Sequence, residues 1–226
     1  MINCGQNGPI TKLAAIIPLM ALPSQGQQAE QTWYKRGLAS IKQGKFDEAI
    51  RAFNMAIRIN PQLTESWLPV NHYFPEGTVL YYDIVGLTAD DLRAQMDEIG
   101  PIGPDDYKSD AFTIWSIKWG WPPCQVDKAT ASYEIMVLFP RWKPPKGASV
   151  QLIAKWTDYV RSLATHEKGH ADYIVENYRL IVDAIKKADC YAAELAAQAA
   201  HSLLQSHDVE YDAITDHGAT QGARFP

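Results

Sequence analysis

The chain has 226 residues, enough for one substantial globular core with a small appendage. Its composition, with 46% hydrophobic and 21% charged residues, excludes a disordered or fibrous protein. The formal net charge is -5 and no block of Lys or Arg occurs, so the chain lacks the basic patch that a phosphate backbone or an anionic lipid surface requires. We therefore expect no nucleic-acid partner.

The first residues have the pattern of a signal peptide. Residues 13–22 are apolar and follow Lys12, and they make up about half of the roughly 20 residues that a membrane span requires. Ser24-Gln25-Gly26 provides a small-x-small cleavage site. We assign residues 1–29 to a signal peptide and expect a secreted or periplasmic protein without a membrane span in its mature chain. A buried N-terminal helix is the alternative, which Pro18 disfavours.

Residues 30–65 resemble a single tetratricopeptide repeat, which is a hairpin of two helices. The small, aromatic and proline positions of the repeat are present at Trp33, Gly37, Ala49, Phe53, Ala56 and Pro61. One repeat cannot bury its own hydrophobic face. The hairpin therefore either docks on the domain that follows or adds to repeats on a protein partner, and the sequence leaves both alternatives open.

Residues 72–226 predict one α+β domain. A strand over 78–86 is followed by a helix over 89–100, which a capping box of Thr88 and Asp91 begins. Two further strands, 111–119 and 131–139, are rich in β-branched and aromatic residues. Together these strands predict a small mixed or antiparallel sheet.

The C-terminal half has a helical period. Apolar residues predict a long core helix over 149–187 and an Ala-rich helix over 190–205. The polar tail, which contains "YDAITDHGATQGARFP", is predicted as an irregular loop that contributes to a site.

Within the long helix stands the string "HEKGH". Residues four apart on a helix share a face, so His166 and His170 can bind one metal ion. Glu167 lies beside that face and is placed to act as a general base on water that Zn²⁺ activates. The alternative is that both imidazoles are hydrogen-bonded core residues and that Glu167 pairs with Lys or Arg. An unpaired polar group is costly in a core, so we favour a zinc site.

A catalytic zinc site needs a third protein ligand. Our first choice is His217, in the Gly-containing tail, and the main rival is Glu194 on the following helix. Tyr211, near His217, is the candidate for stabilising the oxyanion. The weaker ligand candidates are Asp212, His201 and His207.

Three cysteines are present, and Cys4 would be removed with the signal peptide. Cys124 and Cys190 then remain as an even pair. An oxidising compartment permits a disulfide between them, and two separate buried thiols are the alternative.

From about residue 82 to the C-terminus the chain resembles the bacterial DUF922 family of predicted secreted zinc-dependent proteases. The likeness rests on "YYDIVGLTADDLRAQMDEIGP", "AFTIWSIKW", "LFPRW", "HEKGH" and "YDAITDHGATQGA". It implies a zincin-like fold in which the sheet packs on the HExxH helix, and it implies that "YDAITDHG" belongs to the site. It also favours a bridge between Cys124 and Cys190.

We therefore predict a zinc-dependent peptidase of HExxH type. His166, His170 and His217 would bind Zn²⁺, Glu167 would be the catalytic base and acid, and Tyr211 would assist. The strand over 133–139 is the expected sheet edge for a peptide or protein substrate. The alternatives are a non-catalytic adaptor that binds proteins through the hairpin and an amidase that acts on cell-wall peptides.

Overall fold

The computed structural model describes residues 24–64, 70–104 and 106–226. Most of the predicted signal peptide lies outside these ranges. Its last residues, 24–29, form the N-cap and first turn of helix α1 (Gln25–Lys42), where the Ser24 side chain accepts a hydrogen bond from the Gln27 amide. Among the residues described, no helix is both long enough and apolar enough to span a membrane.

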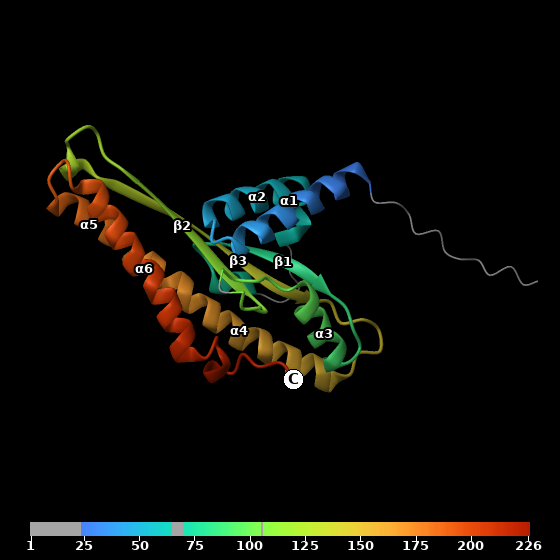
Figure 1. The fold of residues 1–226 in the computed structure, drawn as a ribbon. Coiled ribbons are helices and arrows are strands. Elements are labelled where there is room, and N and C mark those ends of the chain that lie inside the picture. Colours follow the sequence, from blue (N-terminus) through green and yellow to red (C-terminus); the bar gives the residue numbers. More distant parts are fainter. Residues whose placement is uncertain (1–23, 65–69, 105) are drawn as a thin grey trace, which may run out of the picture.

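Helix α1 and helix α2 (Phe46–Ile59) pack against each other as the predicted hairpin (Figure 1). Asp47 and Glu48 in the first turn of α2 complement the positive end of the helix dipole. Phe53, Ala49 and Ala56 are fully buried, as the repeat pattern predicts.

The three strands form one mixed sheet. Strand β3 (Thr130–Trp142) lies in the centre, parallel to β1 (Thr78–Ile84) and antiparallel to β2 (Phe112–Gly120). The predicted edge strand over 133–139 is therefore wrong, because these residues lie inside β3 and are paired on both sides. The edges of the sheet are β1 and β2.

Alternation along the strands gives the sheet two buried faces. On one face Leu80, Ile114 and Met136 form a core with Phe53 and Ile50 of the hairpin. The hairpin thus docks on the domain that follows, as the first of the two alternatives predicts. This contact covers the hydrophobic face that a single repeat cannot bury alone.

The opposite face of the sheet packs on helices (Figure 1). Helix α3 (Ala89–Ile99) begins with the predicted capping box, and helix α4 (Val150–Asn177) carries the "HEKGH" string. The predicted helix over 149–187 is divided by a turn at Tyr178 and Arg179, after which α5 (Leu180–Lys187) continues.

Helix α6 (Ala193–Thr215) extends ten residues beyond the predicted end at residue 205. The expectation of an irregular tail is wrong for this part, because its polar sequence contains no Gly or Pro before Gly218. Tyr211 and Asp212 therefore lie on a helix and not in a loop.

A disulfide joins Cys124 to Cys190 across 66 positions of sequence. It links the loop between β2 and β3 to the segment between α5 and α6. The helix that carries Asp212 is thereby linked covalently to the sheet.

Candidate metal centre

Helix α4 places three polar side chains of the HEKGH string in the core. His166, Glu167 and His170 have exposed fractions of 4%, 4% and 7%. The two histidines are one helical turn apart, and their rings meet edge to face with centroids 5.0 Å apart. Buried polar groups at this spacing require partners, and α6 provides them.

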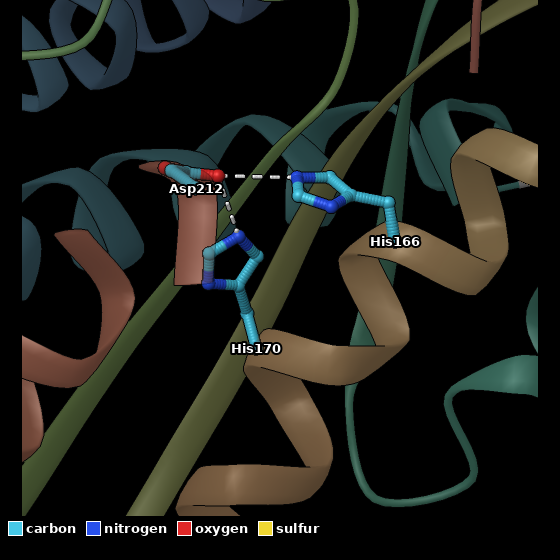
Figure 2. A group of neighbouring side chains, drawn as sticks. All are labelled: His166, His170 and Asp212. Atoms are coloured by element: carbon cyan, nitrogen blue, oxygen red, sulfur yellow. Dashed lines mark hydrogen bonds and ion pairs between the residues drawn. The ribbon is translucent and has the colours of Figure 1, made fainter. Parts of the chain in front are cut away.

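Asp212 of α6 completes a compact group with the two histidines (Figure 2). Its Oδ1 lies 3.2 Å from His166 Nε2 and 3.2 Å from His170 Nε2. One ligand atom from each residue lies within 4.8 Å of the others, so this group could hold a metal ion. Two imidazole nitrogens and one carboxylate oxygen are a donor set that zinc accepts.

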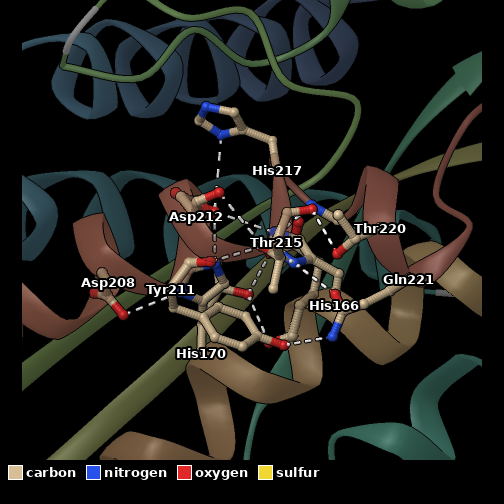
Figure 3. Close-up of polar contacts among 12 residues, drawn as sticks. His166, His170, Asp208, Tyr211, Asp212, Thr215, His217, Thr220 and Gln221 are labelled. Carbon is tan, nitrogen blue, oxygen red and sulfur yellow. Dashed lines mark hydrogen bonds and ion pairs between the residues drawn. The ribbon is translucent and has the colours of Figure 1, made fainter.

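The other ring nitrogen of each histidine, Nδ1, also contacts a polar side chain (Figure 3). His170 Nδ1 lies 3.0 Å from Asp208 Oδ1, and Trp115 Nε1 donates to Asp208 Oδ2 at 2.6 Å. His166 Nδ1 lies 3.0 Å from Gln221 Oε1. Because both Nδ1 atoms face acceptors, each ring is oriented with Nε2 toward the shared centre. Metal-binding histidines in proteins are held in this way.

Two glycines allow this close packing. A Cβ atom on Gly169 would lie 2.1 Å from the Tyr211 hydroxyl oxygen, so the HEKGH string needs Gly where α6 crosses α4. A Cβ on Gly218 would lie 2.8 Å from His166 Cγ. Gly218 follows Asp216 and His217, which have positive φ angles of 50° and 49°, and this left-handed turn brings the tail back over His166.

The charges of the group are strongly coupled. Burial disfavours charge on His170, but its hydrogen bonds to Asp208 and Asp212 outweigh this and raise its pKa to about 10. Burial likewise acts against the Asp212 carboxylate, and the two imidazoles reverse the effect and lower its pKa. The site therefore favours a positive charge between these groups, which a divalent cation would also supply.

Glu167 lies next to this group and is also buried. Burial raises its pKa, although both neighbouring imidazoles oppose the shift. Thr113 on β2 donates a hydrogen bond from Oγ1 to Glu167 Oε2 at 2.7 Å. The edge strand thus fixes one oxygen of this carboxylate, and a raised pKa suits a group that exchanges protons near neutral pH.

The site opens into a cleft of about 1210 Å³. One wall is a face of α4, formed by Lys155, Asp158, Tyr159, Ser162, Leu163, His166, Glu167 and His170. A second wall is the continuous segment 108–113, which leads into the edge strand β2. The cleft therefore lies between the HEKGH helix and the start of β2, an edge strand of the sheet.

The structure does not bring all of the predicted site residues together. His217 also lines the cleft, but its Nδ1 is 3.8 Å from Asp212 Oδ1 and its ring stacks on Tyr107 with centroids 3.8 Å apart. It lies beside the group of potential ligands and is not a member of it. Tyr211 stacks on His166 and accepts a hydrogen bond from Gln221 Nε2 at 2.9 Å, and it does not line the cleft.

The rival ligand candidates lie elsewhere. Glu194 is exposed at the start of α6, about 27 Å along the helix from Asp212, where it accepts a hydrogen bond from Trp119. His201 packs edge to face on Trp115, and His207 stacks on Tyr173.

Sequence reasoning ranked Asp212 low and missed Asp208, Thr113 and Gln221. The two aspartates are four residues apart, so the continuation of the Ala-rich helix through residue 215 would have placed both on one face. Nothing in the local sequence marks Thr113 or Gln221, because both reach the site only through tertiary packing.

Comparison with known protein families identifies two regions of the chain. The tetratricopeptide repeat model matches residues 30–63. A family model described as "Bacterial protein of unknown function (DUF922)" matches residues 79–218, which include the strands, the HEKGH helix and Asp212. No curated protein and no solved structure matches the chain. Since the second match covers more than half of its length, this protein belongs to the DUF922 family.

Proposed function

We propose that this protein is a zinc-dependent peptidase that hydrolyses peptide bonds with Glu167 as its general base. The observation that carries the proposal is the convergence of His166 Nε2 and His170 Nε2 on Asp212 Oδ1 beside a buried glutamate. An arrangement for core packing alone would not need two oriented imidazoles, a carboxylate and a cleft at the same place.

The proposed ligands are His166, His170 and Asp212, with Asp212 in the role that the sequence suggested for His217. Two histidines and one carboxylate also suit ferrous iron. Glu167 favours zinc, because a buried carboxylate directly after a ligand is placed for proton transfer in hydrolysis. Bound zinc would act as a Lewis acid that makes water a nucleophile near neutral pH.

Glu167 would accept the proton of the attacking water and pass it to the leaving amine. Thr113 holds Oε2, which leaves Oε1 to carry the proton. The raised pKa helps the second half of this cycle, since the protonated acid must persist until the amine departs. The arrangement supports a zincin-like mechanism on a helix packed against an edge strand.

We assign the task of binding the developing oxyanion to His217. Its imidazole lies in the cleft, and Tyr107 fixes the ring plane by stacking. The backbone of Asp216 and His217 has positive φ angles, which is a strained conformation for residues other than Gly. A fixed N–H donor at the reacting carbonyl stabilises the transition state. Tyr211 would act behind the site by holding the His166 ring.

The cleft favours an extended polypeptide as substrate. The wall on α4 from Lys155 to His170 is about 22 Å long, which corresponds to six or seven residues of extended chain. The opposite wall, residues 108–113, leads into β2, and an edge strand can pair with a peptide main chain. We therefore propose that β2, and not residues 133–139, is the sheet edge that binds the substrate.

We also propose that the protein works outside the cytosol. The predicted signal peptide and the disulfide between Cys124 and Cys190 both support an oxidising compartment, such as the bacterial periplasm or the extracellular space.

The sequence-based alternatives of an adaptor and of an amidase on cell-wall peptides make different predictions for one experiment.

The test compares the full chain with Glu167→Gln and His170→Ala, using zinc analysis and the cleavage of internally quenched peptides. We expect one zinc ion per chain in the parent and in Glu167→Gln, and cleavage only in the parent. Zinc in the parent without cleavage of linear peptides, while peptides with cell-wall linkages are cut, would support the amidase. Zinc without any hydrolysis would support the adaptor.

A further inference from the structure

We infer that the tetratricopeptide-like hairpin is part of the substrate cleft, and that Phe46 forms with Phe112 a subsite for a large apolar side chain of the substrate. This inference rests on the proposed peptidase function and assigns its substrate class. The hairpin would then select the sequence that is cut, in place of binding a separate partner.

Phe46 is the first residue of α2 and lines the same cleft as His166, Glu167 and Asp212. Its side chain is half-buried, and its ring centroid lies 6.3 Å from that of Phe112 at the start of β2. The two rings therefore form one apolar surface made by both parts of the chain. An aromatic pair offers a large area for apolar contact with little loss of side-chain entropy.

Helix α2, which begins at Phe46, is bonded to the sheet. Beside Phe46, Asp47 accepts a hydrogen bond from Ser116 Oγ on β2, and farther along α2 Asn54 donates to Glu134 on β3 at 2.8 Å. These polar contacts flank the buried core between α2 and the sheet. The backbone of Phe46 is thus anchored to the sheet that carries Phe112.

The turn of the hairpin also contacts the segment that borders the cleft. Lys42 forms an ion pair with Asp106 at 2.9 Å, and Pro104 packs close to Gly44. Pro104 and the neighbouring Tyr107 both line the cleft. The hairpin therefore supports a second part of the same wall.

Two short paths connect this subsite to the proposed chemistry. Along β2, Phe112 precedes Thr113, whose hydroxyl group donates to Glu167. The side chains of the two residues alternate, so Phe112 lies on the face that the hairpin covers and Thr113 on the face that packs on α4. Across the cleft wall, Tyr107 stacks on His217, which lies beside Asp212. The side chains of a substrate main chain beside β2 would alternate in the same way, so one would lie against the Phe46 and Phe112 rings while the main chain next to it faces Glu167.

The surface is suited to an aromatic or long aliphatic side chain. Phe46, Pro104, Phe112 and Tyr107 contribute apolar area to the cleft. The charges of Lys42 and Asp106, on the two segments that carry Phe46 and Tyr107, are paired with each other. Burying one large apolar side chain in such a subsite changes kcat/KM by about tenfold to a hundredfold.

The experiment uses the zinc-loaded full chain and a library of internally quenched peptides that is randomised around the cleavage position. We expect a preference for Phe, Tyr, Leu or Met at one fixed position. In Phe46→Ala, kcat/KM for the best peptide should fall about tenfold to a hundredfold, while its counterpart with Ala at that position should be cut as before. Ile59→Ala, an exposed change on the same helix, is the matched control and should retain the preference.

A binding measurement separates this inference from the function on which it rests. Zinc-loaded Glu167→Gln is titrated calorimetrically with the preferred peptide and with its Ala counterpart, with and without Phe46→Ala. Loss of discrimination only with Phe46→Ala supports the subsite, and unchanged discrimination overturns it. A parent chain without zinc or cleavage overturns the proposed function before Phe46 is tested. If Phe46→Ala unfolds, Phe46→Leu should shift the preference from aromatic toward aliphatic side chains, and an unshifted profile refutes the subsite.

Discussion

Asp208 and His170 are joined by a hydrogen bond of 3.0 Å that turns the other nitrogen of the imidazole toward Asp212 and the candidate metal centre. Trp115 holds the second oxygen of the same carboxylate, so the ring orientation is set by the sheet as well as by α6. The site therefore depends on the contacts behind the potential ligands as much as on the potential ligands themselves.

From this relationship we predict that Asp208→Asn weakens zinc binding about tenfold to a hundredfold without unfolding the chain. The amide cannot provide the charged acceptor that stabilises the ring in its binding orientation. Competition with a chromogenic chelator measures the affinity. Glu210→Gln, an exposed change on the same helix, is the control and should bind zinc like the parent. Equal affinities in both variants would contradict the role of Asp208.

Asp212→Ala and His217→Ala should differ in zinc content. Asp212 belongs to the group whose ligand atoms lie within 4.8 Å, whereas His217 lies beside it. We expect Asp212→Ala to lose bound zinc during dialysis, and His217→Ala to keep one ion per chain while its kcat falls about a hundredfold to a thousandfold. Elemental analysis and peptide cleavage give the two readouts. Zinc loss in His217→Ala would restore it as the third ligand.

Zinc binding at pH 7 should release about one proton. When no cation lies between the groups, the pKa of His170 is about 10, so its imidazole is protonated at pH 7 and must lose that proton to bind zinc. Asp212 has a lowered pKa and contributes none. The apparent affinity should accordingly rise about tenfold for each pH unit up to the pKa of His170.

Calorimetry in buffers with different ionisation enthalpies counts the protons released. Glu167→Gln removes a buried carboxyl group beside the two imidazoles and should leave the count near one. A count near zero in the parent would show that His170 is already neutral.

Gly169→Ala should destabilise the protein, although Ala is normally better than Gly in a helix by about 1 kcal/mol. The added methyl group would overlap the Tyr211 hydroxyl group, whose oxygen would lie only 2.1 Å from the new Cβ atom. We expect the free energy of unfolding to fall by about 1–3 kcal/mol. Thermal denaturation of Gly169→Ala in a Tyr211→Ala background is the control, since the overlap is absent there. Equal losses in both backgrounds would exclude this cause.

Replacing Cys124 and Cys190 together by Ser should lower the free energy of unfolding by about 2–4 kcal/mol, because the bridge closes a long loop in the unfolded chain. Zinc content should stay unchanged, since the bridge lies near the start of α6 and Asp212 near its end, about 30 Å apart along the helix. Denaturant unfolding and elemental analysis measure the two effects. Loss of zinc in the folded variant would mean that the bridge also positions the site.

The amino-acid sequence by itself determined the local elements of this protein. Helical periodicity and the spacing of His166 and His170 placed two candidate ligands and Glu167 on one buried face of α4. The repeat pattern predicted the α1–α2 hairpin, and Thr88 with Asp91 predicted the start of α3. These features depend on neighbours within a few residues, so the chain encodes them directly.

Only the tertiary structure decided which distant residues meet the HEKGH helix. It placed Asp212 among the potential ligands, Thr113 against Glu167 and Phe46 in the cleft, and it made β2 an edge strand of the sheet. These contacts arise because the hairpin and α4 cover opposite faces of one sheet while α6 crosses α4 at Gly169. Packing over such sequence separations is set by the burial of whole faces, which a local pattern does not specify.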